Sequence, residues 1–227
     1  MTTEMKLPLS PLGKLEMILN VPRKKLLDLT KDYKFKVLKK GEILFKHGSE
    51  VNDLIIILKG NLRIVKLLDG REINLTLLNS GDIAGAILLN SSSQSFYPGD
   101  IQSINKSEII LIPKNVYHTC WINDPDIYAK IQNHIQKRIT YLHEDKSSQI
   151  YSIEKKLAIF LLRHFSESLT KKDLAPIFTK REIASALGAR TETIIRAMKI
   201  FEKKQLIKIE RKEIILLDIN KLKSLSV

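Results

Sequence analysis

Charged side chains recur at helical spacing between Thr191 and Lys203. At about 100 degrees per residue, one stripe carries charged side chains and the opposite stripe carries apolar ones. The charged residues are Glu192, Arg196, Lys199 and Lys203, with Ile195 at their edge, and the apolar residues are Ile194, Ala197, Met198 and Phe201. A guanidinium can bind O6 and N7 of guanine, and a carboxylate can accept a hydrogen bond from N4 of cytosine. An ordinary amphipathic surface helix has the same pattern, so the neighbouring elements must decide between the two interpretations.

A short helix and a glycine turn are expected directly before this stripe. Thr179 is followed three residues later by Glu182, which is the spacing of a capping box, so a helix should begin near Lys180. Gly188 can adopt the left-handed conformation that ends a helix, and the second helix should begin near Thr191. This arrangement is that of a helix-turn-helix, and it favours DNA binding over a plain surface helix.

Further elements are expected on both sides of the helix-turn-helix. Ser152 should cap a helix that reaches about Ser168. The segment LIKIERKEIILLD alternates as a hairpin that turns near Arg211-Lys212, and Asp218 should cap a last short helix. The hairpin makes the module a winged one.

Composition limits the class of protein and its compartment. The 227 residues carry a net charge of +13, of which +8 (17 Lys and Arg against 9 Asp and Glu) falls in residues 151–227, around the proposed DNA-reading helices. Cys120 is the only cysteine, so neither an internal disulfide nor a cysteine-ligated iron-sulfur cluster can form within one chain. No window approaches the roughly 18 apolar residues of a membrane span. We therefore expect a cytoplasmic protein without a membrane partner.

The N-terminal half has the pattern of a β domain behind two short helices. Residues 13–32 carry a helical pattern interrupted by Pro22. Between Lys34 and Ile112, short runs of Ile, Leu and Val are separated by glycines about ten residues apart, which predicts an all-β roll or barrel of seven or eight strands. Asp69-Gly70 predicts a type I′ hairpin between residues 62–68 and 72–78. Residues 114–123 should form a short helix.

A long helix is predicted to follow the β domain. The isoleucines and the leucine Ile127, Ile131, Ile135, Ile139 and Leu142 recur at spacings of three or four residues. This stripe can pack onto its own β domain or pair with the same helix of a second subunit, and we favour both at once. The polar residues 145–151 interrupt it and are a candidate hinge. The expected domains are therefore residues 1–124, a dimerisation helix and hinge at 125–150, and a DNA-binding domain at 151–227.

Taken together, the segments KKGEILFKHGSEVNDLIIILKGNLRIVKLLDGREINLTLLNSGDIAG and FTKREIASALGARTETIIRAMKIFEKKQLI resemble the two domains of the bacterial cyclic-AMP receptor and fumarate-nitrate regulator (Crp/Fnr) family. The resemblance covers nearly the whole chain. It implies an α+β protein with a cyclic-nucleotide-binding-like β-roll sensor, a long dimerisation helix and a winged helix-turn-helix. It also implies a homodimeric transcription regulator that binds palindromic double-stranded DNA, contacts RNA polymerase and responds to a small effector.

The resemblance assigns DNA-contacting positions residue by residue. Glu192 and Arg196 stand where family members read bases, Thr191 stands where the cyclic-AMP receptor has a base-reading arginine, and Ile195 lies close to further reading positions. Arg190 occupies the usual small polar cap position. The remaining candidates for DNA contact are Thr179, Lys180, Thr193 and Lys199.

The sensor segment departs from the cyclic-AMP pattern. Gly85 is followed by Ala86 where the ribose-binding pair has glutamate, and Tyr97 and Pro98 replace the Arg-Ser pair that holds the phosphate. A buried phosphate needs a cation or several donors, so cyclic nucleotide binding is disfavoured. The N-terminal cysteine cluster of the iron-sulfur members is absent. The expected effector pocket comprises Gly85, Ala86, Leu88, Tyr97, Pro98, Ile131 and His134.

Another small molecule or haem therefore remains as the signal. The segment GDIAGAILLNSSSQSFYP is similar to that of family members linked to nitrosative stress, some of which use haem to sense nitric oxide. Each of the five histidines, and Cys120, fits a surface or core position better than a sensing one. No metal-ligand set is evident.

Two other classes of protein could share this overall pattern. A β-roll enzyme would need clustered carboxylates, a nucleophile elbow or a phosphate-binding glycine loop, and none of these is present, so we expect no catalytic residues. The alternative is a regulatory binding subunit that uses the winged helix for protein contacts.

Overall fold

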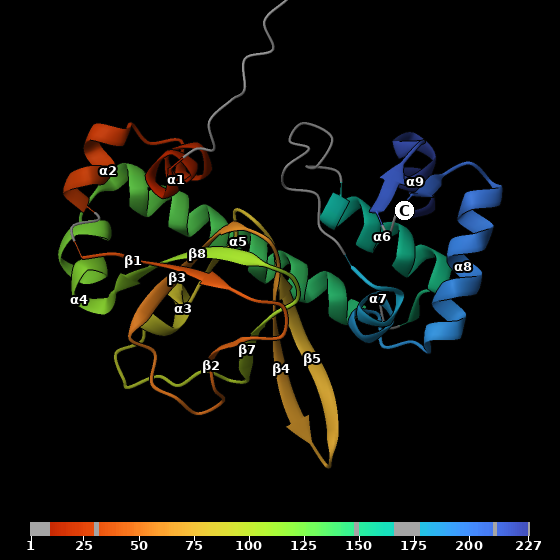
Figure 1. Ribbon diagram of the computed structural model, residues 1–227, viewed down its shortest axis with the longest axis horizontal. Helices are drawn as coiled ribbons and strands as arrows, with labels where there is room; N and C mark the ends of the chain where they lie inside the picture. The colour runs from red at the N-terminus through yellow and green to blue at the C-terminus, as the bar shows by residue number, and fades with distance from the viewer. Residues whose placement is uncertain (1–9, 30–31, 148–149, 166–177, 211–212, 227) are drawn as a thin grey trace, which may run out of the picture.

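The computed structural model describes residues 10–29, 32–147, 150–165, 178–210 and 213–226 (Figure 1). Two helices come first, α1 (Pro11–Leu19) and α2 (Arg23–Leu29). The Ser10 hydroxyl caps α1 by accepting from the Gly13 N–H at 3.2 Å. Pro22 lies between the two helices, so the predicted interruption is confirmed.

Eight strands then form the predicted roll from two antiparallel four-stranded sheets. The strand order is β1-β8-β3-β6 in one sheet and β2-β7-β4-β5 in the other. The bounds are β1 (Lys34–Leu38), β2 (Ile43–Phe45), β3 (Asp53–Lys59), β4 (Leu62–Leu68), β5 (Arg71–Leu78), β6 (Ile83–Ala84), β7 (Asp100–Ser103) and β8 (Ser107–Pro113). Five consecutive residues of β3 are buried, because the strand is central in its sheet and α1 also contacts it.

The β4–β5 hairpin projects beyond the rest of the roll (Figure 1). Asp69 and Gly70 both have positive φ, at 50° and 73°, and Leu68 pairs with Arg71, so the type I′ prediction is confirmed. Gly60 precedes β4 with φ +87°, and a Cβ there would lie 2.4 Å from Ser107 Oγ. Only glycine therefore fits this close approach of the β3–β4 connection to the start of β8.

Helices close one side of the roll and lead out of it. Besides α3 (Ala86–Leu89), these are α4 (Lys114–Val116), the π-helical turn η1 (Tyr117–Trp121) and α5 (Pro125–Ser147). Trp121 Nε1 donates to the Leu29 carbonyl at 2.7 Å and ties η1 to α2. Helix α5 runs from the roll to the C-terminal lobe (Figure 1). It continues through Ser147, so the expected break at residue 145 was placed too early, and residues 148–149 lie outside the described part.

The C-terminal lobe is a winged helix-turn-helix. Its elements are α6 (Ile153–Phe165), α7 (Lys180–Ala186), α8 (Thr191–Lys203), β9 (Ile207–Glu210), β10 (Glu213–Leu216) and α9 (Ile219–Ser226). Ser152 caps α6 at 3.2 Å and Asp218 caps α9 at 2.9 Å, as predicted. The expected end of the first helix near Ser168 and the hairpin turn at 211–212 lie outside the described residues.

The roll and the C-terminal lobe are in direct contact. Leu77 at the end of β5 and Ile104 after β7 are buried in the same apolar cluster as Phe160 of α6 and Phe178 before α7. Next to Leu77, the Asn79 side-chain amide bonds His164 Nδ1 at 2.7 Å. The position of the C-terminal lobe is therefore set partly by β5 of the roll.

Candidate nucleic-acid interface

The helix-turn-helix begins with the predicted capping box. Thr179 Oγ1 accepts from the Glu182 N–H at 3.2 Å, and Glu182 Oε2 accepts from the Thr179 N–H at 2.6 Å. Gly188 has φ +62°, which confirms the left-handed turn after α7. Because Thr179 is used in the cap, it positions the exposed Lys180 at the start of α7.

Helix α8 has one face in the core and the other exposed. Ile194, Ala197, Met198 and Phe201 are each at most 2% exposed, which anchors the helix along its length. Glu192, Arg196 and Lys199 are exposed on the opposite face, and among the described residues none of them forms an ion pair. Their donors and acceptors can therefore meet a ligand without first breaking an internal contact.

The first turn of α8 is built without a side-chain cap. Arg190 is the N-cap residue, with extended backbone angles, and its side chain makes no cap hydrogen bond. Arg190 is exposed, whereas Thr191, Thr193 and Ile195 are partly buried at the edges of the exposed face. Open backbone N–H groups and the helix dipole both favour an anion at such a terminus. A DNA phosphate has the matching charge.

The structure places most of the predicted effector residues together, in or against the core of the roll. Ala86, Tyr97 and Ile131 are at most 4% exposed and belong to the core of the roll, with Leu88 packed against them. Tyr97 stacks on Phe45 at 4.8 Å, and burial raises the pKa of its hydroxyl. Gly85 has φ +90° and approaches the Asp53 carbonyl, as does the Tyr97 hydroxyl. Pro98 is exposed and stands apart from this group.

His134 is a neutral core residue rather than an open ligand. Its Nε2 accepts from the Ile83 N–H at 3.0 Å. Burial, followed by the positive charges of Arg138 and Lys137, lowers the pKa of His134 to about 4. Iron could bind this nitrogen only if the bond to Ile83 were broken, so the residue does not fit a haem ligand in this conformation. Within the described residues, no group of three or more His, Cys, Asp or Glu side chains could hold a metal ion.

The isoleucine stripe of α5 divides into two parts. Ile127 and Ile131 are completely buried against the roll of their own chain, so for these two the expectation of a dimer contact is wrong. Ile135 is partly buried against the same core, and Ile139 is 44% exposed. The Leu142 side chain lies outside the described part. The helix follows the roll first and leaves its apolar face uncovered further on.

Comparisons with known proteins agree with this architecture in both lobes. Residues 35–121 match the cyclic nucleotide-binding domain, and residues 155–225 match the Crp-like helix-turn-helix domain. The chain belongs to the Crp/Fnr family. It is a DNA-binding transcription regulator and not an enzyme. Among the helices in the described ranges, none combines the length and apolar composition that crossing a bilayer would need.

Individual relatives of this Crp/Fnr regulator are distant. The transcriptional activator protein FnrA of Stutzerimonas stutzeri is 23% identical over 190 residues, which are 80% of this chain and 75% of the relative. The cAMP-activated global transcriptional regulator CRP of Pasteurella multocida is 27% identical over 76% of this chain and 84% of its own. The structure of FixK2 from Bradyrhizobium japonicum has a TM-score of 0.74 at 18% identity, covering 86% of this chain and 98% of that one.

Sequence reasoning missed a cavity at the junction of the two lobes of this Crp/Fnr regulator. Elements β5, α5, α6 and α7 line it. Its polar side chains are those of Asn74, Thr76, Arg138, Tyr141, Lys156, Arg163 and His164. These residues are far apart in the sequence and form no motif. The only available signal was their polarity beside an apolar helical stripe, which any exposed helix face would share.

Proposed function

We propose that the chain acts as a homodimer that reads a two-fold symmetric DNA site with its two copies of α8. The exposed and unpaired pair Glu192 and Arg196 carries this proposal. Arg196 can form a bidentate hydrogen bond to a guanine, and Glu192 can accept a hydrogen bond from a cytosine. The two residues lie about one helical turn apart on the same face of α8. Lys180, Arg190 and Lys199 surround them as phosphate contacts. Thr191, Thr193 and Ile195 lie at the edges of the same surface.

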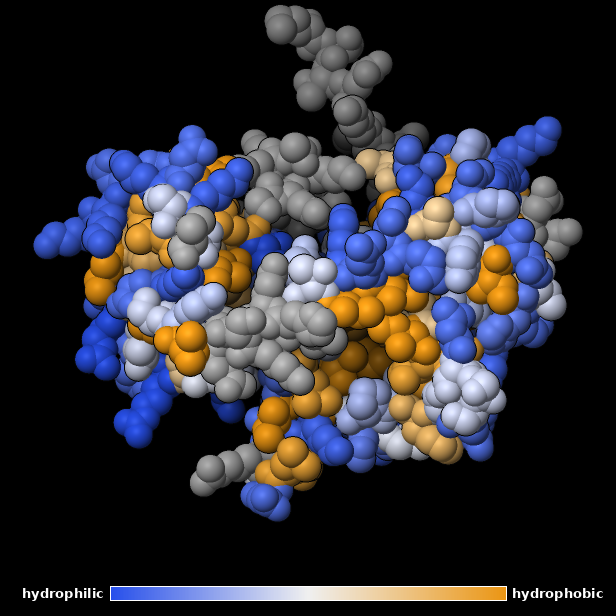
Figure 2. Space-filling model, turned by 180° about the vertical axis from the view of Figure 1, so that it is seen from behind, coloured by the Kyte–Doolittle hydropathy of each residue, from blue (hydrophilic) through white to orange (hydrophobic). Residues whose placement is uncertain are grey.

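Exposed apolar side chains on two elements support the dimer. Figure 2 shows hydrophobic surface around the middle of the molecule and toward the hairpin that projects from it. Among the large exposed apolar residues of these elements are Leu67, Leu68, Ile73 and Leu75 of the hairpin and Ile139 of α5. Large apolar side chains that are exposed close together are typical of a protein interface. A second copy would cover them and would place two reading helices on one duplex.

The signal we propose is a small effector other than cyclic AMP. No arginine or lysine lies among the predicted pocket residues, and the ring of Tyr97 fills the core beside Gly85. A cyclic phosphate placed there would be buried without a cation. Haem is not favoured at His134, whose Nε2 is already hydrogen-bonded. As a transcription regulator, the dimer would also contact RNA polymerase at its target promoters.

Selection of bound sequences from random duplex DNA by the purified protein tests this proposal. We expect a palindrome with half-site centres about one helical turn apart. Arg196→Ala should cost about 1–3 kcal/mol of binding free energy and relax the preference at one base pair per half-site. Lys59→Ala, on the exposed end of β3 in the roll, is the matched control and should leave the selected sequence unchanged.

Three outcomes would contradict the proposal. Binding that is weak, sequence-blind and steeply dependent on salt would show that positive charge alone is acting. A selected half-site without two-fold repetition would argue against the dimer. Full affinity and unchanged preference in Arg196→Ala would favour a winged helix that contacts protein.

A further inference from the structure

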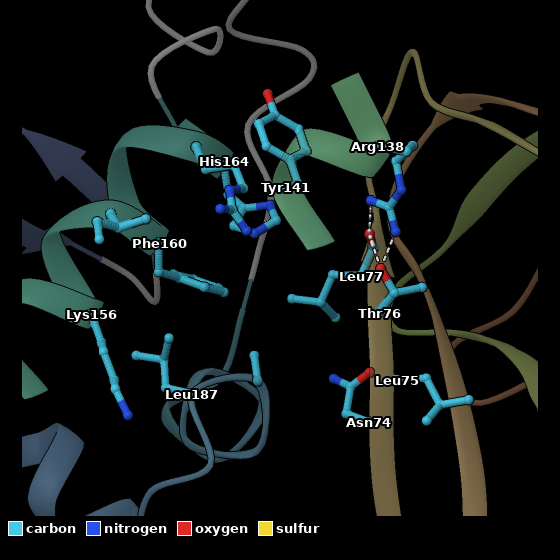
Figure 3. Close-up of a pocket in the computed structure, with 13 residues that line it drawn as sticks. Asn74, Leu75, Thr76, Leu77, Arg138, Tyr141, Lys156, Phe160, His164 and Leu187 are labelled. Atoms are coloured by element: carbon cyan, nitrogen blue, oxygen red, sulfur yellow. Dashed lines mark hydrogen bonds between the residues drawn. The ribbon is translucent and has the colours of Figure 1, made fainter. Parts of the chain in front are cut away.

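The cavity at the junction of the two lobes has a lining drawn from both of them. Figure 3 shows β5 on one side, with Asn74, Thr76 and Leu77, and α6 on the other side, with Lys156, Phe160 and His164. Tyr141 of α5 lies above the gap, and Leu187, directly after α7, lies below it. A molecule in this cavity would therefore contact the roll, the long helix and the DNA-reading lobe at once.

Arg138 is the most unusual side chain of the lining. Its Nη1 donates to the Leu77 carbonyl at 3.1 Å and its Nη2 donates to Thr76 Oγ1, so the guanidinium is fixed against β5 (Figure 3). Both partners are neutral, and no described carboxylate forms an ion pair with Arg138. The side chain is partly buried, and a buried charge is normally compensated by an opposite one. A guanidinium has five N–H groups, so donors remain beyond these two bonds.

The surroundings of Arg138 are positively charged as well as polar. Lys156 and Arg163 line the same cavity, and the Arg163 guanidinium lies 4.5 Å from the centre of the Tyr141 ring. Burial, followed by the charges of Arg163 and Arg138, lowers the pKa of His164 to about 3, so this imidazole is neutral at physiological pH. The aliphatic and aromatic parts of Leu77, Phe160 and Leu187 form the rest of the wall.

We propose that the junction cavity binds a small oxyanion, a phosphate or a short carboxylate, with Arg138 as its principal donor. A planar guanidinium held at two corners presents its remaining N–H groups in the fork that matches two oxygens of such an anion. The cavity volume is about 80 Å³, which is several times the roughly 10–15 Å³ that a single water requires. Inorganic phosphate, with five heavy atoms, has this size.

The site has a consequence for DNA binding that rests on the proposed function. The anion would bridge Arg138 of α5, already fixed to β5, and the basic side chains of α6. It would therefore hold the DNA-reading lobe against the roll. The free energy of anion binding would stabilise this arrangement of the two lobes relative to others. The binding of the anion itself does not depend on what α8 reads.

Isothermal titration calorimetry of the full chain with inorganic phosphate tests the site directly, with chloride exchanged to keep ionic strength constant. Arg138→Gln removes both the positive charge and the paired N–H donors of the guanidinium. Lys137→Gln is the matched control, because it removes the same charge from the neighbouring exposed position, which does not line the cavity. Arg138→Lys keeps the positive charge and loses only the paired N–H donors. Circular dichroism and the thermal midpoint of each variant report its folding.

We expect one phosphate per chain, with the dissociation constant raised roughly tenfold or more by Arg138→Gln, less by Arg138→Lys, and less than about twofold by Lys137→Gln. Acetate and oxalate titrations distinguish a carboxylate ligand from a phosphate one. Absence of saturable heat with all of these anions, or equal losses in Arg138→Gln and Lys137→Gln, would overturn the site. If the wild-type chain binds phosphate but selects no DNA sequence, the proposed function fails and the site stands.

Discussion

Two buried imidazoles should make the stability of this protein fall steeply between pH 6.5 and pH 5. Burial and neighbouring cations lower the pKa of His134 from 6.5 to about 4 and that of His164 from 6.5 to about 3. In the unfolded chain, the pKa of each histidine returns to 6.5. At a pH between the folded and the unfolded pKa values, the histidines are protonated in the unfolded state and neutral in the folded state. The free energy of unfolding therefore decreases as the pH falls.

The expected loss is large compared with ordinary stabilities. Each pKa unit is worth about 1.36 kcal/mol, so each imidazole should cost about 2 kcal/mol when the pH falls from 7.5 to 5. Together the two should cost about 4 kcal/mol, against about 5–15 kcal/mol for the whole stability of a typical domain. Because pH 5 lies above both folded pKa values, the size of the loss depends mainly on the unfolded value of 6.5. The contribution of the two neutral histidines to stability is complete above pH 6.5 and is lost as the pH falls toward about 3–4.

Urea unfolding at fixed protein concentration, followed by circular dichroism at several pH values, measures this dependence. Glutamine is the informative replacement at position 164, because its carbonyl can still accept from the Asn79 amide without titrating. The slope of unfolding free energy against pH should be about 2.7 kcal/mol per unit in the wild type and about 1.4 in His164→Gln. His134→Gln should halve the slope in the same way. Equal slopes in all three proteins would refute the assignment of two buried neutral imidazoles.

Three further predictions concern the reading lobe, the dimer and the core of the roll. Thr179→Ala removes the acceptor of the Glu182 N–H, so it should cost about 1 kcal/mol of unfolding free energy, measured by urea titration. A midpoint equal to that of the wild type would show that the cap is redundant. Ile139→Glu changes an exposed position, so it should leave the monomer folded while raising the dimer dissociation constant at least roughly tenfold by sedimentation velocity, as expected for a buried charge in an interface. A dimer unaffected by Ile139→Glu would place the interface elsewhere. Ile131→Ala, in contrast, removes a buried core side chain and should cost about 2–5 kcal/mol of unfolding free energy.

The features that could be predicted from the sequence are those determined by a few neighbouring residues. The Thr179 and Glu182 capping box, the Asp69-Gly70 turn and the buried face of α8 each depend on residues within one or two turns of chain. Local hydrogen bonds and side-chain periodicity determine these features, so they do not depend on contacts with distant parts of the chain. This is why the DNA-reading face could be proposed before the fold was known, although its base contacts remain predictions.

The features that could not be predicted depend on which of two possible partners a side chain meets. The α5 stripe is uniform in sequence, yet Ile131 is buried in the roll and Ile139 is exposed. Periodicity gives the direction of a side chain but not what lies opposite. The junction cavity is the extreme case, since Thr76, Arg138 and His164 meet only because β5, α5 and α6 pack together. Likewise, the stacking of Tyr97 on Phe45 joins two residues that are far apart in the sequence, so no local pattern predicts it.

The contact between the lobes also gives the roll a second connection to the reader besides α5. Asn61 is buried in the roll, and its amide donates to Asn79 Oδ1 at 3.0 Å. Since that oxygen accepts, the Asn79 amide nitrogen is the donor to His164 Nδ1, and α6 is joined to the roll interior by two hydrogen bonds in series. An effector that moved β5 relative to α6 would have to shift or break the second bond. A double-mutant cycle at Asn79 and His164 would measure this coupling, and a value of zero would mean that apolar contacts alone position the reading lobe.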